Sequence, residues 1–277
     1  MRLLTASTRE AWLWLGGSLL LAVLWTNLSW LFSPWVEADR SPETSQSLAE
    51  RIVFQIGTWR FAPALFQALR FLYYVGLPSA ALFWGRDAVV GRLLGLKRLA
   101  LPAQTGQGDS AWLSASWSSW AQDLGWAAVL GLGATGLLAL ATLTYRRGLQ
   151  PVTDFGPGGR VRGLEAAREA IYNEIHWAFY RNAPIVALGL YWGTWVGLGL
   201  AAVEAMANPA WRHDVQDPER AWPRLSRAAL AVVSCLLFLQ TQNLWLALLL
   251  HWGIWSLLGV MQGAPSSAPA DAASAGE

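Results

Sequence analysis

Residues 124–145, LGWAAVLGLGATGLLALATLTY, form a run of 22 residues that contains no charged side chain. A helix needs about 20 consecutive apolar residues to cross a hydrocarbon core about 30 Å thick. The run also holds Gly125, Gly131, Gly133 and Gly136, and small residues let helices approach each other closely in lipid. It therefore predicts a membrane-spanning helix that packs against other helices.

Apolar runs of similar kind lie on both sides of this one, at 11–32, 61–84, 184–205, 225–239 and 244–261. A more polar helix is expected over 164–181, after a linker rich in glycine and proline. The first run is too long for a signal-peptide core and has no small-x-small cleavage site before Pro34, so we expect it to be retained. We therefore predict an all-α, polytopic transmembrane helical bundle of about six to eight helices, with seven as the working count.

The expected boundaries follow from the same pattern. We predict a single transmembrane domain over residues 1–262 and a disordered tail over 263–277, which is rich in alanine, serine and proline. The polar stretch 102–123 is expected to precede the span at 124–145. The positive-inside rule favours an outside N-terminus, because the loops at 34–60, 146–168 and 205–227 together hold 12 of the 20 basic residues.

The composition excludes several classes of protein. Hydrophobic residues make up 54% of the chain and charged residues 14%, whereas soluble domains carry about 25% charged residues. A net charge of +2 without a dense basic run excludes nucleic acid as a partner, and the lone Cys235 excludes an intramolecular disulfide or a cysteine-based zinc cluster. We expect an integral protein of the cytoplasmic (inner) membrane of a bacterium, in contact with membrane lipid and with many of its 19 tryptophans at the membrane interfaces.

Ionisable residues inside apolar segments are the candidates for a functional site, because a charge is costly at the centre of a bilayer. Helical spacing sorts those of the 164–181 helix into two stripes. Glu174 and Arg181 share one stripe, and Glu169 and His176 share the other. A structural alternative is an ion pair between Glu174 and Arg181, with His176 as a buried hydrogen-bonding residue.

Two further spans contribute Glu204 and His251. Together with His176, these residues form a set of two imidazoles and one carboxylate. Such a set is typical of a site that holds a divalent metal such as zinc and polarises a water for hydrolysis. The sequence therefore predicts a metal site of His176, Glu204 and His251, provided that the three helices bring them together.

Two segments resemble the CPBP family of intramembrane proteases. These segments are Glu174-Ile-His176-Trp-Ala-Phe-Tyr180-Arg181-Asn and, about seventy residues later, Thr241-Gln-Asn-Leu-Trp245-Leu-Ala-Leu-Leu-Leu-His251-Trp-Gly-Ile-Trp255. The family comprises prenyl-protein (CAAX) endopeptidases and bacteriocin-processing or self-immunity proteins. The resemblance covers about residues 120–260. It implies a multi-helix endopeptidase in which glutamate and histidine activate water, with or without a metal, and in which the substrate is a prenylated or helical peptide.

The resemblance implies Glu174, His176, Arg181 and His251 as catalytic residues. The family's Glu-Glu-x-x-x-Arg motif is degenerate here, because the positions of the paired glutamates hold His176 and Trp177. No histidine between His176 and His213 matches the family's middle Phe-x-x-x-His motif. The alternatives of a divergent hydrolase and of a descendant that has lost catalysis therefore both stay open.

Two other classes of function fit parts of the sequence. Ala247-x-x-x-His251, with Trp252 and Trp255 beside it, resembles the pattern of light-harvesting helices in which histidine ligates a pigment. This motif suggests a pigment- or haem-binding subunit of a membrane complex. The third class is a non-catalytic structural or transport protein that packs against partners in a membrane complex. A transport site is expected to show a pair of spans in matching positions that are broken by glycine or proline. The sequence contains no such pair.

Overall fold

A computed structural model describes residues 6–37, 59–84, 110–149 and 163–263. Its elements are α1 (Ala6–Glu37), α3 (Ala62–Phe71), the π-helix η1 (Leu72–Gly76), α4 (Leu77–Trp84), α6 (Ser110–Leu149), α7 (Gly163–Leu188), α8 (Leu190–Ala207), α9 (Pro209–Gln216), α10 (Ala221–Thr241) and α11 (Leu244–Gly263). These residues contain no strand, and they form eight helices when α3, η1 and α4 are counted as one. The predicted all-α bundle is confirmed, whereas the predicted tail lies, from residue 264 on, outside the described residues.

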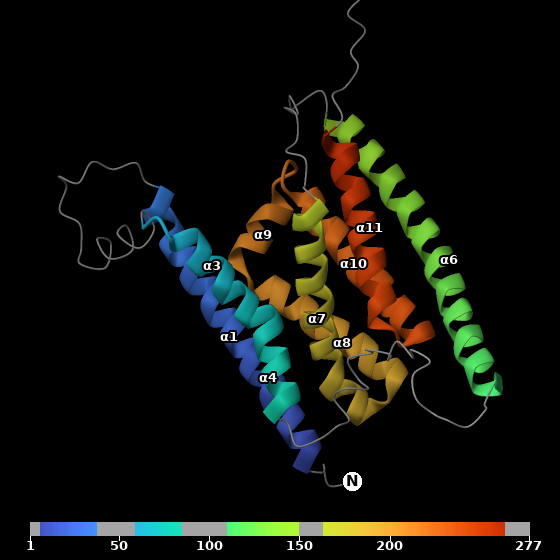
Figure 1. Cartoon of the computed structure of the whole chain (residues 1–277). Coiled ribbons are helices and arrows are strands. Elements are labelled where there is room, and N and C mark those ends of the chain that lie inside the picture. Colours follow the sequence, from blue (N-terminus) through green and yellow to red (C-terminus); the bar gives the residue numbers. More distant parts are fainter. Residues whose placement is uncertain (1–5, 38–58, 85–109, 150–162, 264–277) are drawn as a thin grey trace, which may run out of the picture.

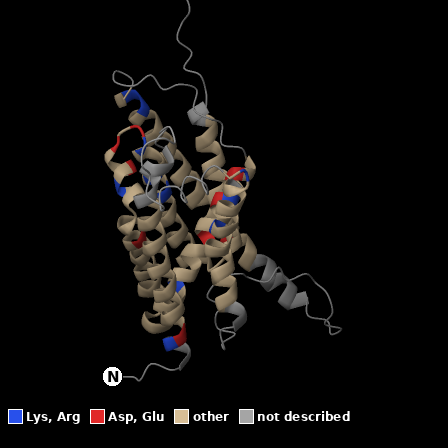
Figure 2. Cartoon of the chain, turned by 90° about the vertical axis from the view of Figure 1, so that its left-hand side faces the viewer, with Lys and Arg blue, Asp and Glu red and all other residues tan. Residues whose placement is uncertain are grey.

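The long helices run up and down beside one another, with α7 at the centre of the bundle (Figure 1). Helix α7 contacts α8, α11, α1 and η1. The start of α7, the end of α6, helix α9 and the start of α10 lie at one end, which we call the upper end (Figure 1). The charged residues also gather mainly in the upper half (Figure 2). The loops 146–168 and 205–227 are predicted to share one side of the membrane. Their described parts do lie at the same end of the bundle.

Three helices are long and apolar enough to cross a membrane, over Arg9–Trp30, Ser119–Leu149 and Ala221–Thr241. A shorter apolar helix covers Leu244–Val260. Helix α6 turns large apolar side chains outward, and Val129, Leu132 and Leu137 are 65%, 76% and 71% exposed. A surface of this kind is stable in lipid and not in water. Length, composition and outward-facing apolar side chains together indicate a membrane protein.

The boundary between α7 and α8 differs from the prediction. The span expected to start at Pro184 does not start there, because α7 continues through Pro184 to Leu188. The break comes instead at Gly189, whose φ of 80° and ψ of 171° belong to a region that essentially only glycine adopts. The backbone conformation at Gly189, rather than the missing amide hydrogen of Pro184, therefore separates the two helices.

Helix α8 folds back and packs closely against α7 through two glycines four residues apart. A Cβ atom added to Gly193 would lie 2.3 Å from the Cα atom of Ile185, and one added to Gly197 would lie 2.7 Å from the Cα atom of Arg181. Small residues at this spacing let helix backbones touch within a membrane. The close approach fixes the position of α8 relative to the polar side chains of α7.

At two other places the helical structure extends beyond the predicted boundaries. Helix α6 begins at Ser110, so much of the polar stretch 102–123 is helical. The predicted loop after α8 contains the short helix α9, in which the Asn208 side chain accepts hydrogen bonds from the amides of Ala210 and Trp211. Hydropathy identifies the apolar part of a helix and not its polar continuation, and both differences have this cause. The polar break at 240–243 is confirmed, because α10 ends at Thr241 and α11 begins at Leu244.

Apolar side chains pack on both sides of α7. On one side Phe179, Tyr180 and Ala183 contact Leu15 of α1 and Ala81 of α4. On the other side Ala178 belongs to a cluster with residues of α10 and α11, namely Leu237, Leu244, Leu246 and Ala247. The polar residues of α7 are thus held between two apolar layers.

Candidate functional site

Helix α7 presents polar side chains on two faces, as the spacing predicts. Glu174 and Arg181 both face α10, where they contact Ser234 and Phe238. Glu169 and His176 both face the other side, where α3 and η1 lie. Residues seven apart share one face of a helix, which explains both sets.

The first candidate pair is His176 with Glu204. Nε2 of His176 donates a hydrogen bond of 2.8 Å to Oε2 of Glu204, which comes from α8. The hydroxyl of Tyr73 donates to the other carboxylate oxygen, Oε1, at 3.2 Å. Tyr180 joins the group, since its hydroxyl lies 3.4 Å from the hydroxyl of Tyr73. This pair therefore combines an imidazole, a carboxylate and two phenols from three parts of the chain.

Aromatic rings enclose the imidazole of His176. The ring centres of Tyr180, Tyr74 and Tyr73 lie 4.3, 5.0 and 5.1 Å from that of His176. Tyr73 and Tyr74 are adjacent in the π-helix η1, a wider turn that frequently occurs at functional sites. Nδ1 of His176 is buried and has no hydrogen-bond partner among the described residues. It is the ring nitrogen whose hydrogen-bonding capacity is not used by the described residues.

A groove lies between two helices on the side of α7 that carries this pair. It has a volume of about 310 Å³ and lies between α1 and α4, with Leu13, Trp14, Gly17 and Leu77 as its apolar lining and Glu10 and Ser18 as its polar lining. Ser18 at its inner part lies within 3.5 Å of the Tyr73 hydroxyl. One residue of the groove's lining, Ser18, is thus in contact with the tyrosine that donates to Glu204.

The second candidate pair is Glu174 with His251. Nδ1 of His251 donates a hydrogen bond of 3.0 Å to Oε1 of Glu174, and the hydroxyl of Ser234 donates one of 2.5 Å to Oε2. The side chains of Glu174 and His251 are 0% and 2% exposed. The indole of Trp177 stacks on the imidazole at 5.4 Å with an interplanar angle of 17°. This pair is sealed inside the bundle.

Arg181 does not form the ion pair considered as an alternative for it. Seven residues separate Glu174 from Arg181, about 10 Å along a helix. The oxygens of Glu174 instead accept hydrogen bonds from His251 and Ser234. The guanidinium of Arg181 lies 4.3 Å from the ring centre of Phe238, and none of its nitrogens has a hydrogen-bond partner in the described part of the chain. The structure therefore contradicts the Glu174–Arg181 half of the structural alternative, whereas its other half, a buried hydrogen-bonding His176, agrees with the contact to Glu204.

The predicted residues form two pairs and not one cluster. Glu174 and His176 are two positions apart, so they point to nearly opposite sides of α7. His251 accordingly lies on one side of α7, and His176 and Glu204 meet on the other. Within the described residues no three His, Cys, Asp or Glu side chains lie close enough together to hold a metal ion. A zinc site usually takes three protein ligands or more, and the described structure does not bring His176, Glu204 and His251 together as one such set.

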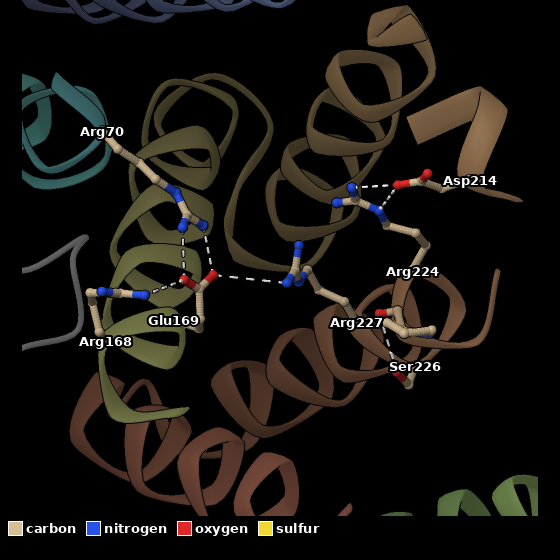
Figure 3. A network of polar contacts seen from close by, with 8 residues as sticks. Arg70, Arg168, Glu169, Asp214, Arg224, Ser226 and Arg227 are labelled. Carbon is tan, nitrogen blue, oxygen red and sulfur yellow. Dashed lines mark hydrogen bonds and ion pairs between the residues drawn. The ribbon is translucent and has the colours of Figure 1, made fainter. Parts of the chain in front are cut away.

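Sequence reasoning missed the hydroxyl groups that complete both pairs. Tyr73 and Tyr180 on one side, and Ser234 on the other, are uncharged residues in apolar helices, where nothing in the spacing distinguishes them. It also missed the partner of Arg70. Arg70 and Glu169 lie 99 positions apart in the sequence, and the structure joins them by two hydrogen bonds (Figure 3).

Comparison of the chain with protein-family models, with curated proteins and with solved structures finds no match. The geometry of the two pairs is therefore the basis on which a function is assigned.

Proposed function

We propose that this chain is an intramembrane hydrolase, an endopeptidase of CPBP-like type, in which His176 and Glu204 activate the attacking water. The observation that carries the proposal is the 2.8 Å hydrogen bond between Nε2 of His176 and Glu204, combined with a buried Nδ1 that has no partner among the described residues. A bacterial cytoplasmic membrane is the compartment we propose for it.

The pair has the chemistry of a general base. An ionised carboxylate only accepts hydrogen bonds, so Glu204 keeps the proton of a neutral His176 on Nε2 and leaves the lone pair on Nδ1. Water gives a proton to Nδ1 while its oxygen adds to the scissile carbonyl. The carbon–nitrogen bond then breaks, and the proton passes from the imidazolium to the leaving amine. The hydroxyls of Tyr73 and Tyr180 are the donors nearest to the pair for the developing oxyanion.

The resemblance to CPBP proteases supports this assignment, because the same two residue types are present with their positions exchanged. Where the family motif has a glutamate, this chain has His176, and the next helix supplies Glu204 instead of a histidine. The two side chains are in direct contact. A glutamate–histidine pair is thus present, with each residue on the helix where the other is expected.

The groove between α1 and α4 supports a substrate with an apolar part. Its lining of leucine, tryptophan and glycine suits a prenyl group or an apolar peptide segment, and its lining residue Ser18 contacts Tyr73. We place the hydrocarbon of a prenylated or helical peptide in this groove. Glu174 and His251, which are sealed on the opposite face, then act by holding α7 in place.

Cleavage by the full-length protein in lipid nanodiscs tests the proposal. The substrates are a farnesylated peptide and an apolar helical peptide, each with a quenched fluorophore. We expect cleavage by the native protein, loss of it in His176→Ala and Glu204→Gln, and no change in His213→Ala, which alters a histidine whose side chain is 54% exposed. Cleavage that survives both of the first two changes would remove the assignment.

Two further measurements separate the alternatives. Cleavage that persists after treatment with a chelator favours a metal-free reaction, and cleavage restored by zinc favours the metal site of the sequence prediction. An absorption band in the purified protein that disappears in His251→Ala would favour the pigment- or haem-binding alternative. A colourless protein would exclude that alternative.

A further inference from the structure

Three guanidinium groups from three helices converge on one carboxylate near the upper end of the bundle (Figure 3). Arg70 of α3 makes two hydrogen bonds to Glu169 of α7, Nη1–Oε1 at 2.8 Å and Nη2–Oε2 at 2.6 Å. Nη2 of Arg168 lies 3.6 Å from Oε1, and Nη2 of Arg227 of α10 lies 3.8 Å from Oε2. We call Arg70, Arg168, Arg227 and Glu169 the arginine cluster.

The arginine cluster has an excess of positive charge. Glu169 is the one carboxylate within ion-pair distance of these three arginines in the described part of the chain, so three positive charges meet one negative charge. The nearby Arg224 is already neutralised by Asp214, at 2.6 Å. Among the described residues, a net charge of +2 therefore remains in the cluster without a counter-ion.

The cluster also has hydrogen-bond donors to spare. Each guanidinium offers five N–H groups, far more in total than one carboxylate can accept. The Nε atoms of Arg168 and Arg227 are buried and have no hydrogen-bond partner among the described residues. An incoming anion with several oxygens would therefore find both charge and donors unused.

Aromatic rings hold two of the arginines in place. The guanidinium of Arg70 lies 5.4 Å from the ring centre of Tyr172 and 5.6 Å from that of Tyr74, and that of Arg227 lies 5.3 Å from the ring centre of Trp255. Stacking on aromatic rings limits the freedom of a guanidinium without using its edge donors. The site is therefore largely preformed.

The cluster is accessible, and it lies near one end of a candidate membrane span. The side chains of Arg70, Arg168 and Arg227 are 25%, 40% and 28% exposed, unlike the buried Arg181. Arg227 lies six residues inside the candidate span that begins at Ala221, about 9 Å along a helix. With Ala221 at the water side of the headgroup layer, which is about 5–7 Å thick, Arg227 starts just inside the hydrocarbon core, and an arginine side chain is long enough to reach back to the lipid phosphates.

We propose that the arginine cluster binds the phosphate group of an anionic phospholipid. Guanidinium forks match the oxygens of a phosphate, and cations at this depth attract anionic lipids. The inference goes beyond the proposed hydrolase and does not depend on it, since neither candidate pair belongs to the cluster.

Native mass spectrometry of the full-length protein in a neutral detergent tests the proposal. The probes are phosphatidylglycerol, phosphatidylcholine with the same acyl chains, and inorganic phosphate. We expect phosphatidylglycerol to bind more tightly than phosphatidylcholine. Arg168→Gln and Arg227→Gln should each weaken its binding about fivefold, because one such charge contributes about 1 kcal/mol near an anionic lipid. Arg147→Gln, which alters an exposed arginine near the same end of the bundle, is the matched control and should have no effect.

A change of opposite sign makes the test independent of damage to the fold. Glu169→Gln keeps the size of the side chain and removes the competing negative charge, so it should tighten the binding of phosphatidylglycerol. The proposal is overturned if all these variants bind both phosphatidylglycerol and inorganic phosphate like the native protein. If the variants change the affinity for inorganic phosphate alone, the cluster is a phosphate site whose ligand comes from solution and not from the bilayer.

Discussion

The two faces of α7 carry the same pair of side chains in different surroundings. On one face α7 supplies Glu174 and α11 supplies His251, and on the other α7 supplies His176 and α8 supplies Glu204. The first pair is 0% and 2% exposed, with a stacked indole covering the imidazole. In the second pair the imidazole of His176 is 4% exposed and Glu204 is 15% exposed, so the carboxylates differ more than the imidazoles, and Tyr73 links Glu204 to Ser18 in the wall of a groove.

The residue types in a glutamate–histidine pair do not by themselves decide whether the pair is structural or catalytic. A sealed pair can neither receive water nor release a product, so under the proposed function its contribution is to the packing of the helices around α7. A pair beside an opening can exchange protons with a substrate. Access, and not composition, separates a structural pair from the proposed catalytic one, and each of the following experiments tests this distinction.

The largest expected effect is on stability, from His251→Ala. The substitution leaves the buried carboxylate of Glu174 with Ser234 as its remaining donor. Removing one partner of a buried pair costs about 3–5 kcal/mol. We expect a loss of this size in the free energy of unfolding, measured by denaturation in mixed detergent micelles.

Two further variants are compared with His251→Ala in the same measurement of stability. His176→Ala should cost less, about 1–2 kcal/mol, because Glu204 keeps the hydrogen bond from Tyr73 and is partly exposed. Glu174→Gln in the His251→Ala background should recover part of the loss, since it removes the unpaired charge. Equal losses from His251→Ala and His176→Ala would mean that both pairs are structural.

The second effect is on activity, from Glu204→Gln. The amide keeps the size of the side chain but no longer holds the imidazole of His176 in the basic tautomer, and loss of a general base lowers the rate about 10²-fold or more. We expect kcat for peptide cleavage to fall by at least about 100-fold, with Glu219→Gln as an exposed control that leaves it unchanged. A greater loss in a folded Glu174→Gln variant would move the catalytic pair to the other face of α7.

Much of the fold follows from the sequence, because apolarity and helical periodicity are local properties. The runs 11–32, 124–145 and 225–239 coincide with the three helices long and apolar enough to cross a membrane. The two stripes of α7 also follow, since they depend on the spacing within one helix. What the sequence predicts less well is where a helix ends when polar residues continue it, as at Ser110.

The partners across helices could not be predicted, because they depend on how the helices pack. Nothing in the spacing of Glu174 or His176 indicates that they meet His251 and Glu204 on opposite sides of α7. The close approach of α8 depends on Gly193 and Gly197, whose neighbours lie in another helix. A set of His176, Glu204 and His251 looks like one metal site in a sequence, whereas α7 stands between its members in the structure.

The third effect tests how α8 positions Glu204. In Gly197→Ala the new Cβ atom would lie 2.7 Å from the Cα atom of Arg181, so α8 must move away from α7. Overpacking of this kind costs about 1–3 kcal/mol, and Glu204, two turns further along α8, should shift from His176. We expect a lower free energy of unfolding together with a severalfold lower kcat. Gly199→Ala, where nothing lies within 4 Å of the added atom, should change neither, and equal behaviour of the two variants would contradict this packing.

The smallest effect compares one hydroxyl from each face. Tyr73→Phe removes the donor to Oε1 of Glu204, and we expect kcat to fall about tenfold, or about 1.4 kcal/mol, with little change in stability. Ser234→Ala removes the donor to Oε2 of Glu174, and we expect about 1–3 kcal/mol less stability with kcat unchanged, because that carboxylate is buried. Tyr74→Phe is the control for the first change, since its ring also packs on His176 but no hydrogen bond joins it to Glu204 in the described part of the chain. If instead Ser234→Ala lowers kcat and Tyr73→Phe lowers only stability, the sealed face is the catalytic one and the difference in access has been assigned the wrong way round.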